Sequence, residues 1–121
     1  MGYFTSQLKF TEIRERRWKL LADLSYKTNS GQIITAPKNF LTDFASVPRF
    51  LHWLLRPNGD YKAAAAIHDW LYQNKTELTR QQSDQIFLEA MVSLRIADWK
   101  KVLLFSSVRT FGGLAWKGRK D

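Results

Sequence analysis

Residues 63–72 have the sequence AAAAIHDWLY, and this stretch decides how the rest of the chain is interpreted. Alanine has the highest helix propensity, and four in a row allow another backbone to approach closely. We therefore predict a helix from about Tyr61 to Tyr72. His68 and Asp69 lie in its middle with apolar neighbours on nearly every side, so at least one of them points into a poorly hydrated place. A buried charge is costly unless it is paired or metal-bound, so this pair needs a partner. Either an internal hydrogen-bond network with Tyr72 or a metal ion could satisfy it.

The chain that follows keeps a helical pattern. Thr79 has Gln82 three residues later, the register of a capping box, which predicts a helix from Thr79 to about Leu94. Asp98 is expected to cap a further helix that runs to about Trp116. Gly112 and Gly113 fall inside that segment, so either the helix ends there or another backbone approaches closely.

The chain before residue 48 reads as extended. Apolar and mostly polar residues alternate over 18–26, which is typical of a strand with one wet face. Asn29–Gly31 is a turn signal, and Ile33–Thr35 is the expected partner strand of a hairpin. Phe4–Ile13 adds a further strand. Between strands and helices, Ser46 is placed to cap a short helix, Pro48–Leu55.

These elements predict a single α+β domain over residues 1–121. A small antiparallel sheet occupies the mostly β residues 1–48, and three to four packed helices occupy residues 49–116. Residues 117–121 form a basic tail.

Two further acids lie where a core or cap residue is expected. Asp84 comes one helical turn before Phe87 and two turns before Met91, so it faces inward with them. Asp43, together with Ser46, lies at the junction of the strands and the helices. These two residues either cap the following helix or belong to a functional loop.

A site built from these residues would offer one nitrogen and several oxygen ligands, which suits zinc, manganese or iron. A metal-bound water beside a carboxylate base is the minimal equipment for hydrolysis. The expected metal ligands are Asp43, His68, Asp69 and Asp84, with Asp43, His68 and Asp84 as catalytic residues and Ser46 and Tyr72 in support. A serine nucleophile, Ser46 with His68 and an acid, ranks lower, and His52 is interpreted as a surface histidine.

The amino-acid composition limits the classes of function that this protein can have. The 121 residues carry 19 Lys and Arg against 11 Asp and Glu, a net charge of +8, which favours weak binding to polyanions. The absence of cysteine excludes disulfides, thiolate metal sites and cysteine nucleophiles. No signal-peptide pattern or apolar run of spanning length occurs, so we expect a protein without a transmembrane segment, made in the cytoplasm.

Four motifs occur in order along the chain: FLTDFASVP at 40–48, AAIHDWLY at 65–72, SDQIF at 83–87 and VRTFGG at 108–113. In this order and spacing the chain resembles the small phage and prophage proteins known as domain of unknown function 1353. The resemblance implies a phage or prophage origin and carries no assigned activity. The resemblance also implies that the polar residues already singled out belong to the family's characteristic motifs. They are Asp43, Ser46, His68, Asp69, Tyr72 and Asp84.

Three functions remain open. The first is a metal-dependent hydrolase that acts on a cell-wall polymer or another anionic polymer. The second is a non-catalytic virion or host-interaction protein, in which the His/Asp cluster is structural and the C-terminal apolar helix docks to other phage proteins. The third is a small inhibitor of a host defence protein. A location in the virion fits the first two.

Overall fold

The computed structural model describes residues 2–14, 17–42, 47, 50–51, 60–74 and 76–117. Within this part of the chain the strands all precede the helices, which confirms the α+β class. The strands are β1 (Tyr3–Phe4), β2 (Phe10–Arg14), β3 (Arg17–Leu20), β4 (Leu24–Lys27), β5 (Ile33–Ala36) and β6 (Leu41–Thr42). The helices are α1 (Asp60–Gln73), α2 (Arg80–Ser93), α3 (Asp98–Phe111) and α4 (Gly113–Lys117).

Several predicted features lie outside the described residues. They are Asp43, Ser46, His52, most of the predicted helix Pro48–Leu55 and most of the basic tail. None of the helices in the described part of the chain has the length and apolar character of a membrane-spanning segment.

The strands form two antiparallel three-stranded sheets, with the orders β1-β4-β5 and β2-β3-β6, rather than one sheet. The predicted hairpin is confirmed, because β4 pairs with β5 and Lys27 lies opposite Ile33 across the Asn29–Gly31 turn. Gly31 has φ 91°, a left-handed backbone conformation that glycine adopts without steric cost.

The continuous strand predicted over 18–26 is wrong. β3 ends at Leu20 and β4 begins at Leu24, and the bend between them carries the chain from one sheet to the other. The bend is held by hydrogen bonds, since Leu21 N–H donates to the Lys9 carbonyl (2.8 Å) and the Asp23 carboxylate accepts the Lys38 N–H (2.7 Å). Buried residues and more exposed residues continue to alternate across the bend. The alternation of apolar and polar residues in the sequence therefore does not reveal the bend. Residues 4–13 likewise contain parts of two strands, β1 and β2.

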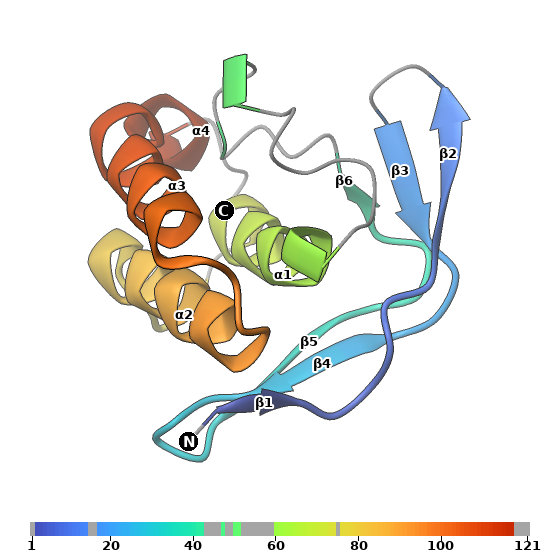
Figure 1. Cartoon of the computed structure of the whole chain (residues 1–121). Helices are drawn as coiled ribbons and strands as arrows, with labels where there is room; N and C mark the ends of the chain where they lie inside the picture. Colours follow the sequence, from blue (N-terminus) through green and yellow to red (C-terminus); the bar gives the residue numbers. More distant parts are fainter. Residues whose placement is uncertain are drawn as a thin grey trace.

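Helix α1 is the centre of the core. It lies between the strands and the helices α2 and α3 (Figure 1). It contacts β4, β5 and β6 on one side and α2 and α4 on the other. Every residue from 62 to 69 is buried, including the four alanines. Because α1 has neighbours all round, small side chains are needed along it, and the two polar residues in its middle are enclosed.

The other helices begin and end as follows. The predicted capping box is present at α2, because the Thr79 hydroxyl accepts the Gln82 N–H (3.1 Å) and the Gln82 side chain accepts the Thr79 N–H (2.8 Å). Asp98 is the first residue of α3 rather than its cap, and its carboxylate pairs with Lys101 (3.0 Å). The single helix predicted to Trp116 is divided at Gly112 into α3 and α4.

Candidate functional site

A fully buried polar pair joins α1 to α2. His68 and Asp84 both have 0% exposure, and His68 Nε2 lies 2.6 Å from Asp84 Oδ1. The His68 ring stacks on Phe87, with ring centroids 4.5 Å apart. Asp84 and Phe87 are nearly one turn apart on α2 and both are buried, which confirms that Asp84 faces inward.

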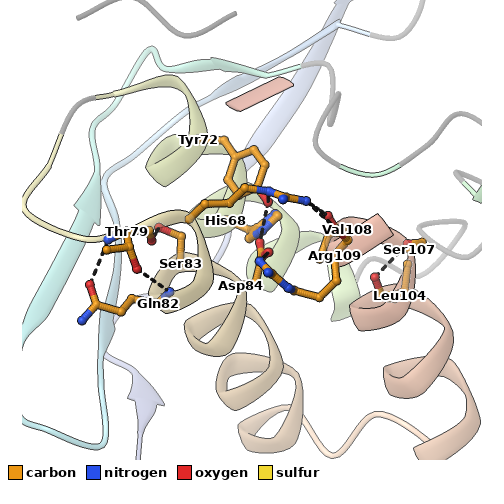
Figure 2. A network of polar contacts seen from close by, with 11 residues as sticks. His68, Tyr72, Thr79, Gln82, Ser83, Asp84, Leu104, Ser107, Val108 and Arg109 are labelled. Carbon is orange, nitrogen blue, oxygen red and sulfur yellow. Dashed lines mark hydrogen bonds and ion pairs between the residues drawn. The ribbon is translucent and has the colours of Figure 1, made fainter. Parts of the chain in front are cut away.

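The Asp84 carboxylate accepts two further hydrogen bonds. The Tyr72 hydroxyl donates to Oδ1 (2.5 Å) and Arg109 Nη1 donates to Oδ2 (2.6 Å), as Figure 2 shows. His68, Tyr72, Asp84 and Arg109 form what we call the buried polar cluster, with side chains from α1, α2 and α3. The sequence left open whether a hydrogen-bond network with Tyr72 or a metal ion satisfies the polar residues of this helix. The network is present, because His68 and Tyr72 both contact the same oxygen of Asp84.

The protonation states follow from burial and from these contacts. Burial lowers the pKa of His68 below its ordinary value, and the Asp84 contact opposes this without overcoming it. Burial acts to raise the pKa of Asp84, but the hydrogen bonds from His68, Tyr72 and Arg109 outweigh it and lower the pKa. Asp84 is therefore ionised and His68 neutral near pH 7. Because an ionised carboxylate can only accept, we assign the imidazole proton to Nε2.

Arg80 extends the cluster to the end of α3. Its Nε donates to the Tyr72 hydroxyl (3.1 Å), and its Nη2 donates to the carbonyls of Val108 (2.7 Å) and Arg109 (2.8 Å). These carbonyls belong to the last turn of α3, where a cation also interacts favourably with the helix dipole. Burial and Asp84 raise the pKa of Tyr72, so its hydroxyl remains a donor to Asp84 while accepting from Arg80.

Asp69 belongs to a different contact set from its neighbour His68. Its Oδ2 accepts hydrogen bonds from the Thr42 hydroxyl of β6 and from Gln73 Nε2 (2.7 Å). Adjacent residues on a helix differ in direction by about 100°, which takes His68 to α2 and Asp69 to β6. Asp69 therefore fastens α1 to the strand that leads into residues 43–46.

The structure thus brings together part of the predicted site. His68, Tyr72 and Asp84 meet, and Asp69 is directed elsewhere. Across the described ranges, no group of three or more His, Asp or Glu side chains is arranged to hold a metal ion. Asp43 and Ser46 lie outside those ranges, so metal ligation by a set that includes Asp43 stays a prediction.

The sequence did not predict the roles of Arg109, a member of the cluster, and of Arg80, which extends it. Arg80 was not singled out, and Arg109 was noted only within a motif. A signal for them existed, because an inward-facing Asp84 needs a cationic or hydrogen-bonding partner. Arg109 interrupts the apolar segment from Val102 to Trp116, and the sequence alone did not show that this segment packs beside α2.

The buried histidine predicts a pH dependence of stability. The pKa of His68 is lowered in the folded state, so below about pH 6.5 the unfolded chain binds a proton that the folded chain does not. The free energy of unfolding therefore falls as the pH is lowered from about 6.5 to 5, by up to about 1.4 kcal/mol per pH unit. Urea denaturation at several pH values measures it.

The variant His68→Gln is expected to flatten this dependence, because its amide can donate to Asp84 and does not titrate. Both proteins are compared on the background His52→Gln, in which no other histidine titrates. Equal slopes for the two proteins between pH 5 and 6.5 would contradict the assignment of a neutral, buried His68.

A family model described as "Protein of unknown function (DUF1353)" matches residues 18–108 of the 121. The chain belongs to this family. The match to DUF1353 includes His68, Asp69, Tyr72 and Asp84 and ends one residue before Arg109. No curated protein and no solved structure matches the chain significantly.

Proposed function

We propose that this member of DUF1353 is a non-catalytic phage or prophage protein, made in the host-cell cytoplasm, that docks to another phage protein and becomes part of the virion. One observation carries the non-catalytic part of this proposal: both oxygens of the fully buried Asp84 already accept hydrogen bonds from His68, Tyr72 and Arg109.

A hydrolytic role for this carboxylate is disfavoured by its contacts. A general base must come within hydrogen-bond distance of the proton it removes, and Asp84 has no exposed surface. A metal ion that ligated Asp84 would compete with the Arg109 guanidinium, a cation 2.6 Å from Oδ2. The cluster instead has the composition of a structural network that fastens three helices together.

The docking surface in this proposal is an apolar face of α3 and α4. Trp99, Val102 and Leu103 follow each other at the spacing of one helix face and are exposed, Val102 by 63%. Leu114 of α4 is 83% exposed. Exposed apolar side chains on one helix face, like the three of α3, are typical of interaction sites. We name these four residues the α3–α4 face.

The charge of the same segment indicates the kind of partner. Residues 95–121 contain seven Lys and Arg against two Asp. A partner surface with an apolar centre and an acidic rim would complement this arrangement, because opposite charges around an interface steer and orient binding.

The test uses particles from the strain that encodes the protein. Purified virions are expected to contain the chain at a fixed ratio to another virion protein, measured by quantitative mass spectrometry. Val102→Glu is expected to reduce that ratio about tenfold or more, because it places a charge in the apolar interface. Ile33→Glu is the matched control, since Ile33 on β5 has nearly the same exposure, 62%.

Two outcomes would contradict the proposal. One is absence of the chain both from virions and from any complex with a phage-encoded protein. The other is hydrolysis of purified cell wall by the wild type that a folded Asp84→Asn variant lacks, with metal bound in stoichiometric amount. That second outcome would favour the hydrolase with Asp43, His68, Asp69 and Asp84 as ligands.

A further inference from the structure

A groove lies between the β4–β5 turn and α2, and its lining differs from the rest of this basic protein. Its volume is about 360 Å³, within the range of small-molecule sites. Five primary amides line it together with one carboxylate: Asn29, Gln32, Gln81, Gln82, Gln85 and Glu89. We name this the amide groove. In a chain of net charge +8, no Lys or Arg among the described residues lines it.

The amide groove is separate from the buried polar cluster. Gln81, Gln82 and Gln85 are exposed, whereas Ser83 and Asp84 between them are buried. Figure 2 shows Gln82 on the side of α2 away from Asp84. A ligand in the groove would therefore contact neither that cluster nor the α3–α4 face, so this inference does not depend on the proposed function.

Three of the lining side chains are already held in place. Glu89 Oε1 accepts the Tyr26 hydroxyl (2.9 Å) and the Asn29 N–H (2.7 Å). Gln82 Oε1 accepts the Thr79 N–H (2.8 Å), and Asn29 Oδ1 accepts the Gly2 N–H. Burial and Glu89 raise the pKa of Tyr26, so its hydroxyl keeps the proton that it donates. Each side chain is fixed through one oxygen, which reduces the entropy that a ligand would cost to order it.

The same side chains keep polar atoms available for a ligand. Within the described part of the chain, Glu89 Oε2, Gln82 Nε2 and Asn29 Nδ2 make no hydrogen bond. The side chains of Gln81 and Gln85 make none there either. The groove thus combines one fixed carboxylate acceptor with fixed amide donors and with amides that can both donate and accept.

This lining indicates the chemistry of the ligand. An anion would meet Glu89, and no Lys or Arg of the described lining would compensate for that charge. A cation would meet a single carboxylate that already accepts two hydrogen bonds. An uncharged ligand rich in hydroxyl groups satisfies both kinds of polar atom. Leu78 and Ile86 also line the groove and offer apolar surface to the C–H face of a sugar ring. We propose that the amide groove binds an uncharged saccharide.

The experiment is a titration of ¹⁵N-labelled protein followed by NMR. The probes are maltotriose and triacetylchitotriose at millimolar concentration, which distinguish a plain hexose from an N-acetylated one. Shifts are expected with at least one of them at residues 28–32 and 78–89. The double variant Gln81→Ala/Gln85→Ala is expected to weaken binding about tenfold. Gln7→Ala, at an exposed glutamine outside the groove, is expected to bind like the wild type.

Other results would overturn the proposal. They are the absence of shifts with both sugars, shifts outside the groove, or equal affinity in the double variant. Stronger binding of the neutral peptide N-acetyl-trialanine amide at the same residues would assign the groove to a peptide instead. Both glutamines are exposed, and their side chains make no hydrogen bond within the described residues, so the variants are expected to fold, and their spectra show whether they do.

Discussion

Replacing Asp84 with asparagine is expected to lower the free energy of unfolding by about 3 kcal/mol. Asparagine keeps the shape of the side chain but offers one acceptor oxygen in place of two. Its amide group would face either the Arg109 guanidinium or the donors His68 and Tyr72. This loss of stability is near the lower end of the range for breaking a buried ion pair, because the Arg109 side chain is 36% exposed and can reach water.

Urea denaturation at pH 7 measures the effect of Asp84→Asn. The matched control is Asp98→Asn, in which the carboxylate is 96% exposed and, within the described residues, pairs with Lys101 one turn away. A surface pair of this kind contributes little, so the control is expected to change stability by less than about 0.5 kcal/mol. An Asp84→Asn variant as stable as this control would refute a structural role for the buried polar cluster.

Replacing Gly112 with alanine is expected to lower the free energy of unfolding by about 2 kcal/mol. A Cβ at this position would lie 2.5 Å from the Val108 carbonyl oxygen and 2.9 Å from the Tyr72 hydroxyl. The first of these is backbone and cannot move without disturbing the end of α3. The second is fixed by Asp84 and Arg80, so relief of the clash would disturb the cluster as well.

Gly113→Ala is the matched control for this prediction. A Cβ there would come no closer than 3.8 Å to Arg80, an ordinary van der Waals contact. Gly113 begins α4, so alanine is expected to raise stability by up to about 1 kcal/mol through its helix propensity. Thermal unfolding of the two variants should move in opposite directions. Equal stability of both would show that Gly112 is not needed for the approach of Tyr72.

Local features of the sequence were sufficient for several parts of the fold. The alanine run and its apolar neighbours predicted α1, the Asn29–Gly31 turn predicted the β4–β5 hairpin, and Thr79 with Gln82 predicted the start of α2. Each of these depends on residues a few positions apart, where propensity and capping act directly. The inward direction of Asp84 followed in the same way, from its place on the apolar face of its helix.

The sequence by itself determined that at least one of His68 and Asp69 would be buried, that Asp84 would face inward, and that these polar groups would need partners. Only the tertiary structure decided which partners they have. Arg109 is 25 residues from Asp84 and comes within 2.6 Å because α3 packs on α2. The bend at residues 21–23, which divides the strands between two sheets, is likewise held by contacts with Lys9 and Lys38. Hydrophobic periodicity records which side of an element is buried, but it does not record which distant element covers that side, because many neighbours bury an apolar face equally well.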